Sequence, residues 1–388
     1  MWAVFGVVVL YYAPLYMREV GLTSPQIGWV GSITLACSFV FQVLAAPVTN
    51  RLGRKRATLL ADLISWTLPM FVWAVARSFE AFVLAAVLNA VVRIASVSWS
   101  LLTIEDVEQS QRARVLGILN LIVAGCGLLT PLIGLPMSRY GVVPTMSVFY
   151  ALGGVGMTVM FLWRNAITQE TQVGQAAIQE HRELHPWQSV SLTLRQVLAM
   201  RQHPGLPAVV AFYTLSVFLE QLGLFQILFY REALGFSVGA LSWVPVATAA
   251  VTALMYGLVL RRLAGVPAER TLVGTRVLGL VGAALVLLIP AGNLAVLLGV
   301  VCVLSAATFL TQTYRDAVLF GRLPQRGGAD LYSGVQLLSL LLSIPAAGLG
   351  GLLYHGQPRV LFEVIALLNV GLLLLAMGLA RTRTATAG

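Results

Sequence analysis

The chain consists largely of apolar segments of about 20 residues, the length that an α-helix needs to cross the hydrocarbon core of a bilayer. Hydrophobic residues make up 58% of the sequence and charged residues only 10%, whereas a soluble chain is usually about one quarter charged. A soluble fold of this composition would expose large apolar patches. The sequence therefore predicts an all-α, multi-pass protein of the lipid bilayer.

Charged residues, glycines and prolines divide the apolar sequence into twelve expected spans in two sets of six. The first set covers 1–17, 24–48, 57–76, 79–102, 113–136 and 143–163, and the second covers 205–229, 238–260, 270–290, 293–315, 331–353 and 359–381. This pattern predicts two six-helix domains, residues 1–164 and 205–388, joined by a polar linker at 165–204.

The linker is expected on the cytoplasmic side and holds a possible surface helix. Val190, Leu194, Val197 and Leu198 recur at helical spacing, which favours a helix along the membrane surface. The alternative is a solvated linker with some helical content.

Basic residues are distributed unevenly between the two sides of the expected spans. If both termini are cytoplasmic, 19 Lys and Arg residues, Arg276 and Arg315 among them, fall on the inner side and five on the outer side. Positive loops are retained in the cytoplasm, so we expect cytoplasmic termini, in a bacterial cytoplasmic membrane. The basic residues form scattered clusters, not one stripe, which argues against a nucleic-acid partner.

The two sets of spans resemble each other at a constant offset of 214 residues. The matching pairs are Tyr16 and Tyr230, Gly21 and Gly235, Trp29 and Trp243, Arg112 and Arg326, Pro131 and Pro345, and Gly134 and Gly348. Such matches indicate two parallel six-helix repeats, an arrangement that places a binding site between the halves near the membrane midplane.

The segment between the second and third spans carries a recognisable pattern, APVTNRLGRKR from Ala46 to Arg56. It resembles the G-x-x-x-D-R-x-G-R-R/K loop of the major facilitator superfamily, and the resemblance extends over nearly the whole chain. It implies a twelve-helix transporter fold with a charge-paired inner gate. The implied gate residues are Asn50, Arg51, Gly53, Arg54, Lys55, Glu105 and Asp106.

Two positions depart from this pattern, because Ala46 replaces the usual Gly and Asn50 replaces the usual Asp. Asn50 is able to cap a helix but supplies no negative charge. The gate is then expected to depend more on Glu105 and Asp106. The alternative is that the basic residues only keep the loop in the cytoplasm.

In the fifth span, Pro131 and Gly134 match a segment that is typical of the superfamily's antiporters. They predict a bend in that helix and weakly favour antiport. The alternative is that small residues and a proline simply permit close helix packing.

Two ionisable residues lie inside expected spans, Arg93 in the fourth and Glu220 in the seventh. A charge at the bilayer centre costs at least about 2.5 to 3.5 kcal/mol on insertion scales, so each calls for an explanation. The resemblance places both spans beside the central cavity. We expect Glu220 to be the coupling or cation-binding carboxylate, and Arg93 to pair with Glu220 or to hold an anionic group of the solute. The alternatives are structural helix contacts without a role in transport.

Three polar or aromatic side chains are further candidates for contact with the solute: Tyr12, Tyr213 and Gln221. For each of them alone, packing or interfacial anchoring is the alternative.

The sequence contains no nucleotide-binding P-loop, no H-E-x-x-H metal pair and no G-x-S-x-G nucleophile elbow, which argues against ATP-driven pumping and hydrolysis. We expect no cofactor and no metal. The sequence predicts a monomeric secondary transporter of small organic solutes, working by proton-coupled efflux. The alternatives are an uptake symporter or facilitator and a non-transporting receptor or scaffold with the same fold.

Overall fold

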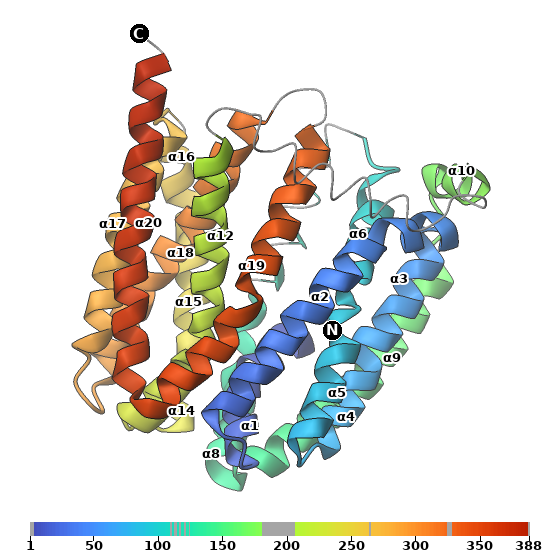
Figure 1. The fold of residues 1–388 in the computed structure, drawn as a ribbon. Coiled ribbons are helices and arrows are strands. Elements are labelled where there is room, and N and C mark those ends of the chain that lie inside the picture. The colour runs from blue at the N-terminus through green and yellow to red at the C-terminus, as the bar shows by residue number, and fades with distance from the viewer. Residues whose placement is uncertain are drawn as a thin grey trace.

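The computed structural model describes residues 4–108, 111, 115, 118–119, 122–123, 125–180, 206–263, 265–323 and 328–386. Within these residues every regular element is a helix. Figure 1 shows two groups of long helices lying side by side, one from each half of the chain.

In its described residues the N-terminal half consists of helices, and several of its spans are divided into shorter helices. Its elements are η1 (Val4–Val9), α1 (Ala13–Glu19), α2 (Ser24–Leu52), α3 (Arg54–Asp62), η2 (Leu63–Thr67), α4 (Leu68–Val75), α5 (Phe79–Ala90), α6 (Val92–Ile104), η3 (Gly127–Leu129), α8 (Pro131–Tyr140) and α9 (Val142–Ile167). Here η1 and η2 are π-helices and η3 is a 3₁₀ turn.

The C-terminal half repeats this organisation. Its elements are α12 (Leu206–Leu222), η5 (Gly223–Phe225), α13 (Gln226–Leu228), η6 (Phe229–Ala233), α14 (Val238–Leu241), α15 (Trp243–Leu254), η7 (Met255–Val259), α16 (Leu260–Leu263), α17 (Ala268–Leu287), α18 (Leu294–Arg322), α19 (Gly328–Gly356) and α20 (Pro358–Thr386).

Ten helices of the described residues are long and apolar enough to cross a membrane. They correspond to the expected spans two to four and six to twelve. The first expected span is formed by the short elements η1 and α1, and the fifth lies partly outside the described residues. The all-helical membrane fold predicted from the sequence is thus confirmed.

The linker contributes one described helix, α10 (Gln172–Glu180), which packs against α2. The surface helix expected around Val190 to Leu198 lies outside the described residues.

The repeat is visible in local backbone geometry. Gly21 and Gly235 both have positive φ, 109° and 71°, a conformation that favours glycine at a tight turn. The helices that follow each glycine begin with an equivalent cap, since Thr23 and Ser237 accept backbone N–H bonds from Gln26 and Ala240. The 214-residue offset therefore reflects two repeats that build the same turn and helix start.

Small residues bring the two halves together along two pairs of helices. In the α2–α19 pair, Gly28 and Gly351 face one another, and the Ser32 hydroxyl accepts a hydrogen bond from the Gly348 backbone N–H at 2.9 Å. In the α8–α14 pair, Gly134 lies directly against Ser242, the residue that follows α14. A Cβ atom on Gly28 or Gly134 would collide with the opposite half.

These contacts define what we call the closed end of the molecule, the end that carries α1, α8 and α14. The opposite end, which carries α10 and the loop between α2 and α3, is called the linker end. The ribbons of the two halves adjoin at the closed end and diverge toward the linker end (Figure 1).

Candidate functional site

Glu220 lies near the middle of the seventh span, close to the C-terminal end of α12, and pairs with an arginine from α18. The Arg315 Nη1 atom donates to Glu220 Oε1 at 3.2 Å, and Gln312 Nε2 donates to the same oxygen at 3.4 Å. The Arg315 side chain is 8% exposed and that of Glu220 is 39% exposed. A mid-span carboxylate with this exposure implies water access from within the protein, because lipid does not solvate a charge.

Arg315 is held in place by more than Glu220. Its guanidinium lies over the Tyr213 ring, 4.2 Å from the centroid, a cation–π arrangement that orients the charge. Its Nε donates at 3.5 Å to the neighbouring Asp316. The predicted residue Tyr213 therefore contacts Arg315 and not Glu220 in the described hydrogen bonds and ion pairs.

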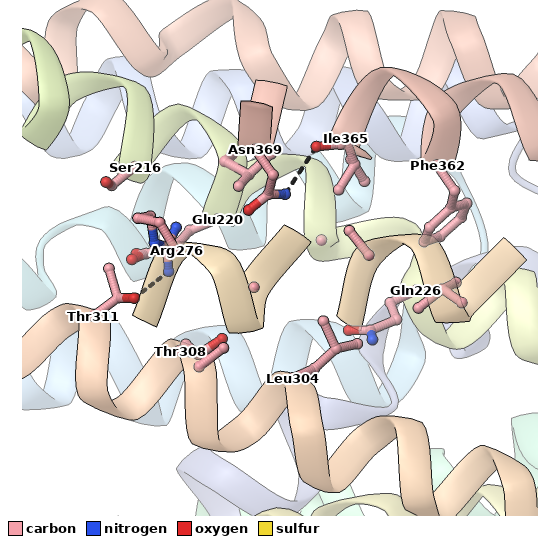
Figure 2. A pocket seen from close by; sticks show the side chains of 16 residues that line it. Ser216, Glu220, Gln226, Arg276, Leu304, Thr308, Thr311, Phe362, Ile365 and Asn369 are labelled. Atoms are coloured by element: carbon pink, nitrogen blue, oxygen red, sulfur yellow. Dashed lines mark hydrogen bonds between the residues drawn. The ribbon is translucent and has the colours of Figure 1, made fainter. Parts of the chain in front are cut away.

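A cavity of 320 Å³ adjoins Glu220 and is lined by α12, α13, α17, α18 and α20. Its charged and polar lining residues are Ser216, Glu220, Gln226, Arg276, Thr308, Thr311 and Asn369. Apolar side chains such as Leu219, Val286 and Phe362 complete the wall. We call this space the C-half cavity. Figure 2 shows Ser216, Glu220, Arg276 and Thr311 at one side of it, with Phe362 and Gln226 at the other.

A second cavity of 360 Å³ lies between α13, α15 and α18. It shares Gln226, Leu304 and Thr308 with the C-half cavity. Both spaces are therefore built by the C-terminal half alone.

Arg276 is the basic residue of the C-half cavity. The side chain comes from α17 and the residue is 5% exposed. One guanidinium nitrogen, Nη2, donates to Thr311 Oγ1, whereas Nε is buried and has no hydrogen-bond partner among the described residues. Glu220 and Arg315 lie close enough to Arg276 to interact with it electrostatically.

Arg93 lies apart from the pair formed by Glu220 and Arg315. It lies in the first turn of α6, just after a break at Val91, where the Asn89 amide donates to the Ser65 carbonyl of η2 at 2.7 Å. Arg93 lines neither of the two cavities beside Glu220, and its Nε is buried without a hydrogen-bond partner among the described residues. Glu220 takes Arg315 as its partner, so the expected pairing of Arg93 with Glu220 is not formed.

The two remaining candidates for solute contact line neither of these cavities. Gln221 is half-buried and lines neither cavity. Tyr12 is fully buried, and its hydroxyl donates to the Thr130 carbonyl at 3.3 Å, close to the contact between Gly134 and Ser242. Tyr12 thus belongs to the packing that joins the halves at the closed end.

At the linker end, Arg54 forms the centre of a charge cluster. Its Nη2 and Nε atoms donate to Glu105 at 3.0 to 3.2 Å, and its Nη1 donates to the Asn50 amide oxygen at 3.2 Å. Arg51 and Asp106 are exposed, and the Lys55 side chain is half-buried. Arg54 and Glu105 both belong to the N-terminal half, so this pair does not bridge the two halves.

Glu170, in the linker, completes this cluster and was not predicted. Its carboxylate accepts the backbone N–H groups of Arg54 at 3.0 Å and Lys55 at 2.9 Å, the first turn of α3. A carboxylate at a helix N-terminus is stabilised by the helix dipole and the free N–H groups. Gly53 makes room for it, because its φ is 83° and a Cβ atom there would lie 2.5 Å from Glu170 Oε2.

The fifth span is interrupted by a short 3₁₀ turn just before Pro131, the residue at which the sequence predicts a bend. Gly127 to Leu129 form a 3₁₀ turn, and Pro131 begins α8. Gly134, one turn later, provides the close approach to Ser242 and Tyr12.

Sequence reasoning counted Arg276 and Arg315 only among the basic residues of the inner side and did not single them out as site residues. Both are buried inside helices, α17 and α18. Little in the sequence indicates that Arg315 is buried, because this residue stands at the end of an apolar run. The helix itself continues beyond Asp316 as far as Arg322.

The structural comparisons identify the same architecture in known transporters. The nucleoside transporter NupG matches with a TM-score of 0.71 and 13% identity over 97% of this chain and 95% of that chain. The xylose transporter XylE from E. coli, in an inward open conformation, matches with a TM-score of 0.68 and 13% identity over 96% of this chain and 91% of that chain. A POT family transporter in complex with 5-aminolevulinic acid matches with a TM-score of 0.68 and 11% identity over 97% of this chain and 91% of that chain.

A search of curated proteins gave no match. The sequence model of the Major Facilitator Superfamily, however, matches residues 1–329, well over half of the chain. With the helical membrane fold and the two repeats described above, this match assigns the family: the chain is a membrane transporter of the major facilitator superfamily.

Proposed function

We propose that this protein exports small organic solutes in exchange for protons, with Glu220 as the coupling carboxylate. The observation that carries the proposal is the pair of Glu220 and Arg315, in which a partly exposed mid-span carboxylate faces a buried guanidinium beside a cavity. Deprotonated Glu220 holds Arg315. Protonation removes the negative charge and releases the guanidinium, so the charge of the cavity depends on the proton.

Exchange follows if solute and proton use the same carboxylate in turn. A solute that binds at Glu220 displaces its proton, and a proton that binds there weakens the solute site. Pro131 and Gly134, which match the antiporter segment in the fifth span, support exchange over co-transport. Uptake together with protons remains the competing function, and it predicts proton movement in the same direction as the solute.

The positions of the interhalf contacts support alternating access. The closed end is joined by Gly28, Gly134 and Gly351, while the linker end carries the Arg54 cluster within one half. With the linker end in the cytoplasm, as the arginine distribution predicts, the structure corresponds to an inward-facing state. We propose that the cluster around Arg54 and Glu105 steadies the N-terminal half while the other half moves.

The test uses proteoliposomes loaded with the pH dye pyranine and challenged with a panel of small organic cations, anions and zwitterions. Exchange predicts that an outward-directed solute gradient acidifies the lumen faster than in empty liposomes, and that Glu220→Gln abolishes this signal. Glu363→Gln is the matched control, because Glu363 is exposed near the opposite end of α20 from the linker end. If no solute moves protons, or if Glu220→Gln behaves as wild type, the proposal fails.

A further inference from the structure

The C-half cavity contains two features that the proposed exchange at Glu220 leaves unexplained: a buried arginine and a space larger than a proton site requires. Arg276 is 5% exposed, and no carboxylate within ion-pair distance of it is found among the described residues. Burying a cation without a hydrogen-bonded counter-charge is unfavourable. The cavity volume of 320 Å³ is ample for a small organic molecule.

The local packing positions Arg276 for a ligand. Thr311 accepts from Nη2 and itself donates to Thr275 Oγ1 at 3.1 Å, which fixes one edge of the guanidinium. The Nε N–H keeps no partner among the described residues. Gly279, one turn further along α17, lines the cavity and leaves open the space between Arg276 and Asn369. A planar anion such as a carboxylate matches the N–H groups of a guanidinium.

Glu220 contributes a negative charge to the same cavity. Glu220 uses Oε1 for both Arg315 and Gln312, and its side chain remains 39% exposed. The two acids Glu220 and Asp316 balance the two arginines Arg276 and Arg315. A ligand with a net charge would upset this balance, whereas a zwitterion would preserve it and satisfy both poles.

The rest of the cavity wall is largely apolar and therefore favours a ligand whose uncharged part is apolar. Leu219, Val286, Leu304, Phe362 and Ile365 supply apolar surface between the charged side and Gln226. Hydrophobic walls with a few placed polar groups are typical of small-molecule sites.

We propose that the C-half cavity binds a small zwitterionic solute with an apolar body, its carboxylate on Arg276 and its ammonium on Glu220. This inference rests on the proposed transport function and specifies the solute class. It also places the site inside the C-terminal half, between α12, α17, α18 and α20.

The experiment measures equilibrium binding to the purified full-length protein, which requires no flux. The probes are leucine, phenylalanine and tryptophan, each compared with its methyl ester, which keeps only the ammonium, and its N-acetyl derivative, which keeps only the carboxylate. At least one free amino acid is expected to bind at least tenfold more tightly than either of its derivatives. Equal binding of a derivative, or no binding of any free amino acid, overturns the proposal.

Variants at several positions of the C-half cavity test where the ligand binds, so that the result does not depend on Arg276 alone. Arg276→Gln is expected to weaken binding at least tenfold, and Arg276→Lys less. Gly279→Leu and Ala283→Leu fill the cavity and keep every charge, so they should also weaken binding at least tenfold. Gly274→Leu is the matched control on the same helix, because Gly274 is exposed, lines neither cavity and has no described residue within 4 Å of an added Cβ.

The two proposals fail in different ways. If pH-driven flux is present but Gly279→Leu and Ala283→Leu bind the zwitterions as wild type, the cavity assignment is wrong and exchange stands. If these variants lose binding while the wild type shows no proton-coupled flux, the cavity assignment stands and exchange is wrong.

Discussion

Arg18 and Glu232 occupy equivalent positions in the two repeats, 214 residues apart, and form an ion pair across the interface between the halves. Arg18 Nε and Glu232 Oε1 are 2.6 Å apart, and the other carboxylate oxygen accepts from the Tyr354 hydroxyl at 2.9 Å. These opposite charges, at the same position of the two repeats, come together only while the closed end is closed. The pair therefore stabilises this conformation over any in which that end opens.

Replacing Glu232 with Gln should open the closed end more often. Since both side chains are about one third exposed, the loss is of the order of 1 kcal/mol, or a roughly fivefold population shift. The measurement is maleimide labelling of Ser32→Cys, buried at 3%, in a background without Cys37, Cys126 and Cys302. The charge-swapped double variant Arg18→Glu with Glu232→Arg should restore slow labelling. Equally fast labelling in the double variant would contradict an ion-pair effect.

Gly134→Leu should prevent the closed end from closing. The new side chain would collide with Ser242 and the Tyr12 hydroxyl, and a packed interface does not absorb such a volume without moving apart. We expect solute transport at least tenfold below wild type, with faster labelling of Ser32→Cys. Gly125→Leu is the control, since no described residue lies within 4 Å of a Cβ at Gly125. Normal transport by Gly134→Leu would disprove the steric argument.

Arg315→Gln should uncouple transport from the pH gradient, because protonation of Glu220 then no longer releases a guanidinium beside the cavity. Arg315→Lys keeps the charge but loses the planar fork and the full stacking on Tyr213, so its coupling should be intermediate. The readout is pH-driven flux in proteoliposomes, with at least a tenfold loss for Gln. Arg270→Gln, at an exposed position on α17, should behave as wild type. If Arg315→Gln retains full coupling, Arg315 has only a structural role.

Glu170→Ala should destabilise the linker end. It leaves the Arg54 and Lys55 N–H groups without their side-chain acceptor, and loss of a helix cap typically costs about 0.5–2 kcal/mol. The expected result is a Tm lower by a few degrees in detergent. Gln169→Ala, at the exposed neighbouring position, should leave the Tm unchanged. An unchanged Tm for Glu170→Ala would show that the cap contributes little.

Sequence by itself determined the class of the protein, most of its spans and the repeat. Apolar run length is a local property, and lipid leaves a spanning chain few alternatives to the helix. The 214-residue offset was also readable, because matched glycines such as Gly21 and Gly235 are required by the same turn in both halves.

The tertiary structure alone decided which charges meet. Glu220 is recognisable in the sequence as a mid-span acid, but its partner Arg315 comes from a helix 95 positions away, and Arg93 and Arg315 are equally basic in sequence. Glu170 reaches α3 from the linker, 116 positions from Arg54. Such pairings depend on how helices rotate and pack against one another, since side chains meet only where those rotations bring them together, and neither hydropathy nor local spacing specifies that rotation.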